Sequence, residues 1–192
     1  EEQILKNIIQ RPEFPFEHNF PILDSSKQIE DVDKKDIEII RMLGGEPFLD
    51  ERFLKLLNEV DLPNVKVYFV TNCSIFPKKW IKTLSKAKEL VVMFSIDGVD
   101  EVGEFVRYGF KQKRFEANLR KWLDFLKDQD TTIYYHYVVH IMNVLNYEKS
   151  MNFSKNFRGE VWLSMVHSPK YLNLNILPDK IKQYISNKIK SK

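Results

Sequence analysis

The chain has 192 residues, of which 43% are hydrophobic and 30% charged, a balance typical of a soluble globular domain and not of a disordered chain. Its 30 Lys and Arg against 27 Asp and Glu give a net charge of +3, too mild to indicate nucleic-acid binding by itself. The apolar runs are strand-sized, which excludes a transmembrane helix. The acidic start at Glu1 shows no signal peptide, and the single cysteine, Cys73, excludes an internal disulfide and indicates a cytoplasmic setting.

The first 36 residues differ in pattern from the rest. Residues 1–10 have apolar side chains at helical spacing, 11–21 form an extended loop rich in proline and phenylalanine, and 25–36 are polar with one short helix expected. We therefore predict an N-terminal helix and packed loop over 1–36, and an α/β unit with a basic C-terminal helix over 37–192. Because the chain begins with Glu1, we expect a processed chain or a piece of a longer one.

From residue 37 onward, strand-like and helix-like patterns alternate. The predicted strands cover residues 37–43, 65–71, 89–97, 131–142 and 160–167. The predicted helices cover residues 49–60, 77–88, 114–129, 146–157 and 178–192, with Asp50 as the N-cap of the first. This alternation predicts an α/β fold with about five parallel strands and outer helices, either open or curled into a barrel.

The periodicity of the strands distinguishes the two arrangements. Along the third strand, Leu90, Val92 and Phe94 share one face, while Val91, Met93 and Ser95 share the other. A flat sheet buried on both sides is expected to be apolar on both faces. The polar members of the second face therefore favour a curled, incomplete barrel with a site in its lumen over a flat, doubly wound sheet.

Polar groups follow each predicted strand, and parallel strands bring their carboxyl ends to one edge of a sheet. We therefore predict that these side chains converge on one concavity: Glu46, Asn72, Ser95, Asp97 and His136. The pair Gly44–Gly45 has two possible interpretations: an ordinary tight turn, or a binding site where a ligand approaches the backbone closely.

Two kinds of site are not supported. Neither phosphate-loop pattern, GxGxxG nor GxxxxGK[ST], occurs. His136 and His140 have the spacing of a helical zinc pair, but on a strand four residues span ~13 Å, too far for one metal. We predict no metal site here, and the simplest role for Cys73 is that of a small buried side chain.

Three motifs in order, GGEP at Gly44–Pro47, TNC at Thr71–Cys73 and SIDG at Ser95–Gly98, resemble the radical S-adenosylmethionine (SAM) superfamily. The resemblance is greatest to the branch that carries accessory twitch or SPASM half-domains, and it covers residues 37–123 best. It implies an incomplete (β/α)6-type barrel. It also implies SAM and a [4Fe-4S] cluster as cofactors, and a 5′-deoxyadenosyl radical that abstracts hydrogen from a substrate.

The resemblance also implies roles for particular residues. Gly44, Gly45, Glu46 and Pro47 match the turn that binds the amino end of the SAM methionine. Ser95 and Asp97 match polar side chains that bind the ribose. Asn72 lies in a TNG-like turn in which Cys73 replaces glycine, His136 matches a fifth-strand position, and residues 166–169 match the adenine region.

The cluster of that family requires a CxxxCxxC loop, and this chain has one cysteine in a different place. One account is a fragment of a radical SAM enzyme that is inactive alone and binds SAM weakly or undetectably, and whose substrate is unknown and could be a peptide. The alternative is a non-catalytic barrel remnant that serves as a binding or interaction module. An exposed edge at 37–43, unless covered by the N-terminal segment, could pair with another copy, whereas nucleic-acid binding through 178–192 is not favoured.

Overall fold

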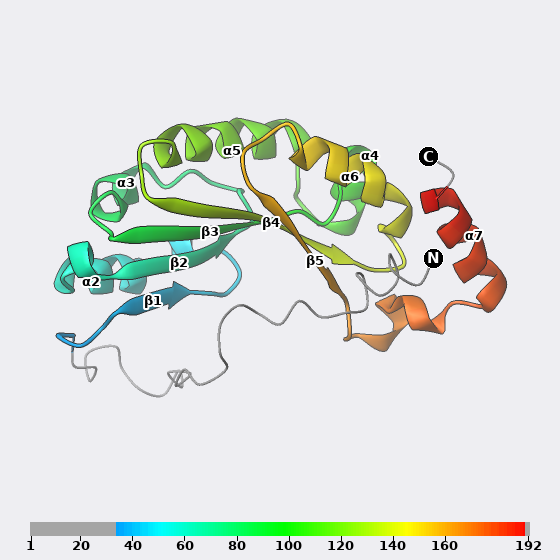
Figure 1. The fold of residues 1–192 in the computed structure, drawn as a ribbon, viewed down its shortest axis with the longest axis horizontal. Helices are drawn as coiled ribbons and strands as arrows, with labels where there is room; N and C mark the ends of the chain where they lie inside the picture. The colour runs from blue at the N-terminus through cyan, green and yellow to red at the C-terminus, as the bar shows by residue number, and fades with distance from the viewer. Residues whose placement is uncertain (1–33, 191–192) are drawn as a thin grey trace.

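Five parallel strands in chain order form the framework of the molecule (Figure 1). A computed structural model describes residues 34–190, and its strands are β1 (Ile39–Met42), β2 (Lys66–Thr71), β3 (Glu89–Ser95), β4 (Thr131–Val139) and β5 (Glu160–Met165). Every adjacent pair is parallel, from β1–β2 to β4–β5. The predicted α/β class with five parallel strands is confirmed.

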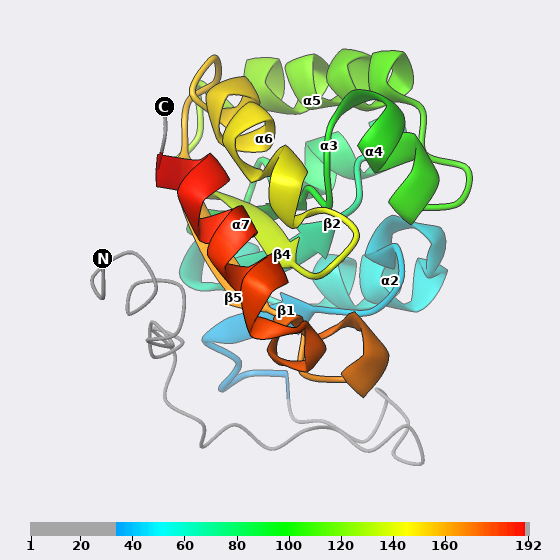
Figure 2. The same cartoon turned by 90° about the vertical axis from the view of Figure 1, so that its right-hand side faces the viewer.

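Five helices connect the strands on the outer side of the sheet: α2 (Glu51–Glu59), α3 (Lys78–Leu84), α4 (Asp100–Val106), α5 (Gln112–Leu126) and α6 (Tyr147–Ser154). A further helix, α7 (Asp179–Lys190), follows β5. Short 3-10 helices are η2 (Pro47–Leu49), η3 (Leu62–Asn64), η4 (Val144–Asn146), η5 (Lys170–Leu172) and η6 (Leu174–Ile176). Figure 2 shows α2 to α6 around one side of the curled sheet, with α7 beyond the carboxyl ends of the strands. In the described part of the chain, no helix is both long and apolar enough to cross a bilayer.

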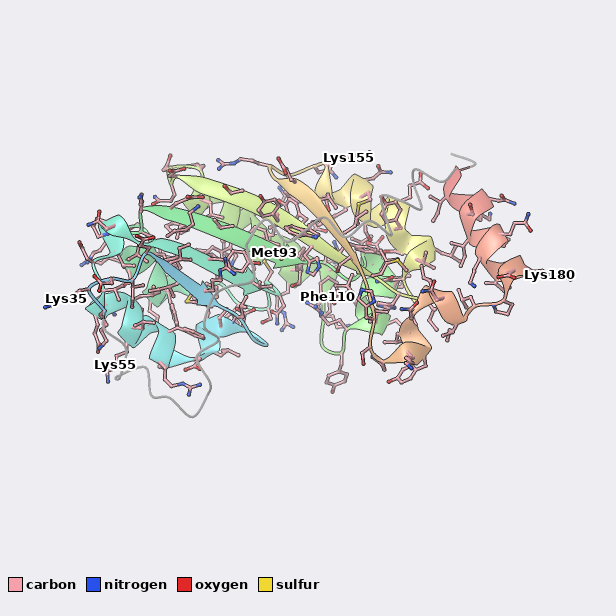
Figure 3. The ribbon with its side chains drawn as sticks, turned by 60° about the horizontal axis from the view of Figure 1, so that its bottom comes forward. Lys35, Lys55, Met93, Phe110, Lys155 and Lys180 are labelled. Atoms are coloured by element: carbon pink, nitrogen blue, oxygen red, sulfur yellow. The ribbon has the colours of Figure 1, made fainter. Side chains whose placement is uncertain are left out.

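The two faces of the sheet have different environments, as the strand periodicity predicts. Leu90, Val92 and Phe94 belong to the main core together with the outer helices. The opposite face carries a small separate cluster that includes Tyr68, Met93 and Trp162, and Figure 3 shows Met93 in the middle of the sheet. Ser95 and His136 lie on this second face, next to each other in register, so the polar groups project away from the helices.

The main core is centred on aromatic rings. Trp122 of α5 is completely buried, and its ring centroid lies 5.1 Å from that of Phe48 and 5.2 Å from that of Phe69. Phe48 comes directly after the Gly44–Pro47 turn and packs edge-on against Trp80 of α3. The core thus anchors the turn that follows β1 to the helices behind the sheet.

Several predicted boundaries are wrong. The third and fourth strands end earlier than predicted, so Asp97 and His140 lie in the loops beyond them. The chain turns after β4 because His140 N–H donates to the Asn143 side chain, and Asn143 N–H donates back to the His140 carbonyl. The short helix α4 was not predicted. The elements predicted over residues 1–33 lie outside the described residues, and Lys34–Asp36 form a turn.

Candidate functional site

The loops that follow the five strands, here called the rim, comprise residues 43–50, 72–77, 96–111, 140–146 and 166–177. Gly44 has φ +130°, a backbone conformation that residues other than glycine rarely adopt. A Cβ added at Gly44 or Gly45 would meet no heavy atom within 4 Å. The glycine pair is therefore not required by close packing against the protein, and it leaves open space beside Glu46.

The Glu46 carboxylate is held by the loop after the neighbouring strand. Its oxygens accept hydrogen bonds from Thr71 Oγ1 at 3.1 and 2.9 Å and from the Asn72 backbone N–H at 3.0 Å. Burial raises the pKa of Glu46, while the hydrogen bonds and the positive charge of Arg107 oppose the rise without cancelling it. The carboxylate is fixed in place yet only partly stabilised in its charged form, so a bound cation would stabilise it further.

The turn at Asn72–Cys73 has an unusual backbone. Cys73 has φ +56°, although it is not glycine. Its N–H donates to Thr71 Oγ1 at 3.1 Å, and its carbonyl accepts from the Asn118 side chain at 2.9 Å. Asn72 Nδ2 donates to the Gly45 carbonyl at 3.4 Å, so this turn is bonded both to α5 and to the glycine pair.

Cys73 itself is not suited to holding a metal or cluster. Its side chain is completely buried, and burial raises the pKa of the thiol well above its ordinary value. Metal ligation needs the thiolate. The residues present therefore do not fit the [4Fe-4S] cluster that the family resemblance implies, and within residues 34–190 no group of three or more potential metal ligands occurs.

Ser95 and Asp97 lie at and beyond the carboxyl end of β3. Asp97 forms an ion pair with Arg107, which follows α4. The Asp97 backbone carbonyl accepts a hydrogen bond from Asn143 Nδ2 at 2.8 Å. The position of Asp97 is thus set by the loops on both sides of it.

His136 occupies the next strand along the sheet. Its Nε2 lies 2.7 Å from Ser164 Oγ on β5. Burial lowers the pKa of His136, and the negative charge of Asp97 opposes this only in part. His136 is therefore mainly neutral at pH 7, available as a hydrogen-bond donor or acceptor and not as a fixed positive charge.

The structure thus brings the predicted site residues together in two groups. Glu46 contacts Asn72 directly, and Ser95 lies beside His136. Arg107 connects the groups, because it pairs with Asp97 and its charge acts on the pKa of Glu46. No direct contact between the two groups is among the described interactions.

A separate open hollow lies far from this site. It is lined by residues at the amino ends of β1, β2 and β3, including Lys35, Asn64 and Lys88. Figure 3 shows Lys35 at one end of the molecule and Phe110, which lies between α4 and α5, near the middle. The hollow is therefore not part of the predicted site.

Three residues that support the rim were not predicted. Buried Asn143 and Asn146 connect the loops after β3 and β4, the latter by accepting from Val99 N–H at 2.9 Å. Arg107 pairs with Asp97 across ten positions of sequence. In the sequence, a buried asparagine cannot be told from a solvated loop asparagine. Only Arg107, a lone base after an acidic stretch, had a sequence pattern that could have indicated an ion pair in this loop.

The raised pKa of Glu46 predicts a specific pH dependence of stability. The ionised carboxylate is less favourable in the folded chain than in the unfolded one, where its pKa is near the ordinary 4.5. Its contribution to stability is complete below that value and is lost as pH rises through the higher folded pKa. Relative to Glu46→Gln, the wild-type chain should lose stability in urea unfolding as the pH rises above 4.5.

Thr71→Val is the matched control for this measurement. It removes a hydrogen bond that lowers the pKa of Glu46, so the loss should move to higher pH. Parallel stability curves for wild type and Glu46→Gln over the whole range would contradict the assigned environment of this carboxylate.

Comparisons with known proteins place this rim in a family context. The family model described as "Radical SAM superfamily" matches residues 15–153. This range includes β1 to β4 and the predicted site residues from Gly44 to His136, but not the predicted adenine region at 166–169. A search of curated proteins found no match.

Proposed function

Because the chain belongs to the radical SAM superfamily, we propose that it binds S-adenosylmethionine at the rim, as the cofactor-binding core of a radical SAM enzyme. The observation that supports this most is the Glu46 carboxylate, fixed by Thr71 and Asn72 beside the open glycine pair. We also propose that the chain belongs to the twitch/SPASM-associated branch, on the strength of the GGEP, TNC and SIDG motifs.

Glu46 is the proposed ligand for the ammonium group of the methionine end. A carboxylate accepts strong, charge-assisted hydrogen bonds from an ammonium. Oε2 already accepts from both Thr71 and Asn72, so Oε1, which has the longer bond to Thr71, is the oxygen proposed to meet the ammonium. The Gly44–Gly45 backbone adds carbonyl groups without side chains that would block the approach. Pro47 begins η2 and directs Phe48 into the core, which holds the turn in place.

Ser95 and Asp97 are the proposed ligands for the ribose. A carboxylate can accept hydrogen bonds from both ribose hydroxyls, as in other nucleotide sites. Asp97 is paired with Arg107 in the described structure, so ribose binding requires Arg107 to share or leave the carboxylate. His136, one strand away and mainly neutral, is placed to donate or accept one further hydrogen bond.

SAM supplies the radical chemistry of this family when it binds beside a cluster. The 192 residues do not provide the three cysteine thiolates for that cluster, and we derive no reaction step through it. The burial of Cys73 favours a second candidate function for these residues alone, a non-catalytic module that binds SAM or a related nucleoside without radical chemistry.

Affinity measurements test the proposed site. Hydrogen bonds to charged groups contribute about 1.5–3 kcal/mol each against an association cost of at least about 4 kcal/mol. We therefore expect a dissociation constant of about 1 mM, accessible by ligand-observed NMR. Glu46→Gln and Asp97→Asn should each weaken binding by about tenfold or more.

Glu59→Gln, which changes an exposed carboxylate on α2, is the matched control and should leave the affinity unchanged. If all three variants bind SAM as the wild type does, the proposed ligands are wrong. If the wild-type chain shows no binding at ~20 mM SAM, well above the expected constant, the proposal fails for this chain.

A further inference from the structure

The outer edge of β5 carries a row of unpaired backbone groups. Val166 N–H donates to the Val139 carbonyl of β4 at 3.0 Å. In a parallel pair, alternate residues direct their N–H and C=O to the neighbouring strand, so those of Val161, Leu163 and Met165 point away from β4. Within residues 34–190, no hydrogen bond is formed by the backbone groups of these three residues. They are therefore available to a further strand.

The sequence of this edge has none of the features that usually block strand pairing. From Val161 to Met165 it contains no charged residue, proline or glycine. The register with β4 is continuous over the whole strand, so no bulge bends the edge away. Val161 is 38% exposed. A regular, apolar, open edge of this kind is a template for pairing with another strand.

The opposite edge of the sheet, β1, is less suited to pairing. It has four residues, whereas β5 has six. Lys66 N–H donates to the Glu38 carbonyl at 2.9 Å, so the outward backbone groups of β1 belong to Ile39 and Arg41. Arg41 adds a charge to this edge, and charged residues on edge strands oppose pairing. Of the two edges, β5 is therefore the better template.

The pattern of β5 is self-complementary when two copies run antiparallel. A two-fold axis at Leu163 places it opposite the partner's Leu163, and places Val161 opposite the partner's Met165. These are the residues whose backbone groups point outward, so each opposed pair can exchange two N–H···O=C bonds. Glu160, the one charged residue of β5, then lies opposite the partner's Val166, and no like charges face each other.

We infer that two copies of this chain associate antiparallel through β5, which joins their two five-stranded sheets into one. A strand of a different protein would have to supply the same apolar pattern, whereas a second copy always supplies it. The paired strands run in opposite directions, so the two rims lie at opposite ends of the joined sheet. The inference is independent of the proposed function, because it involves none of the proposed SAM ligands.

Sedimentation velocity tests the association. The chain should show a concentration-dependent dimer between ~10 µM and ~1 mM, the range of weak association. Val161→Lys should weaken the dimer about tenfold or more, because it adds a lysine twice to the paired edge. The matched control is Ile39→Lys on β1, where the side chain is similarly exposed, at 36%. It should leave the dimer affinity within about twofold.

Cysteine cross-linking tests the register. Under mild oxidation Leu163→Cys should form a disulfide-linked dimer, because the axis places the two Cα atoms ~5.5 Å apart. The native Cys73 is completely buried and does not compete. Val161→Cys is the control: four residues of offset separate its two copies by ~13 Å, so it should not cross-link.

Three results would each overturn the inference. The first is a chain that stays monomeric at ~1 mM. The second is a dimer that Val161→Lys leaves intact or that Ile39→Lys weakens equally. The third is cross-linking of Val161→Cys as efficient as that of Leu163→Cys. Far-UV circular dichroism of each variant confirms that a lost dimer is not an unfolded chain.

Discussion

Trp122→Ala should lower the free energy of unfolding by about 3–5 kcal/mol. The indole is completely buried and its ring contacts those of Phe48, Phe69 and Phe76, the last at a centroid distance of 5.3 Å. Removing it leaves a cavity that rigid neighbouring rings cannot fill, in addition to the lost transfer free energy. Urea unfolding followed by far-UV circular dichroism measures the change.

Trp122→Phe is the matched control. The indole N–H has no hydrogen-bond partner within the described residues, so the phenyl ring loses volume but no polar contact. We expect this variant to lose about 1–2 kcal/mol. An alanine variant within about 1 kcal/mol of the wild type would show that α5 does not anchor the core as described.

Asn143→Ala should lower the free energy of unfolding by about 3 kcal/mol or more. The side chain is completely buried. Its Nδ2 donates to the Asp97 and Val138 carbonyls at 2.8 Å, and its Oδ1 accepts from His140 N–H at 2.8 Å. Alanine leaves three backbone groups without their partner, and each costs about 1–3 kcal/mol when buried.

Thermal unfolding and amide hydrogen exchange measure the destabilisation expected for Asn143→Ala. Exchange at His140 N–H should accelerate in Asn143→Ala, because that hydrogen bond is lost. Asn156→Ala, an exposed asparagine after α6, is the control and should change stability by no more than about 0.5 kcal/mol. If both variants unfold at the same temperature as the wild type, Asn143 does not hold the two loops together.

The strand order and the two-faced sheet were predictable because they depend on local alternation. Leu90 and Val92 face the helices while Met93 and Ser95 do not, and a period of two reveals this directly. Helix α4 was not predictable in the same way. It has seven residues, and its position depends on Gly103, where an added Cβ would lie 2.6 Å from the Gly98 carbonyl oxygen.

The residues of the candidate site also fall into those that the sequence predicts and those that it does not. The carboxyl ends of parallel strands meet by geometry, so the placement of Glu46 beside Asn72 follows from the order of the elements. The bond from Asn143 to Asp97 joins residues 46 positions apart, and no local pattern specifies it. Asn143 was missed because its sequence environment is that of an ordinary loop asparagine. Arg107 stands out as a base after an acidic stretch, but its pairing with Asp97 depends on the folded loops.

The most direct test of the proposed SAM site is a map of backbone amide shifts in ¹H–¹⁵N NMR spectra during titration with SAM. The account predicts that the largest shifts occur at Gly44, Gly45, Asn72 and Asp97. Shifts concentrated instead at the hollow near Lys35, or no shift at the rim while other amides respond, would contradict it.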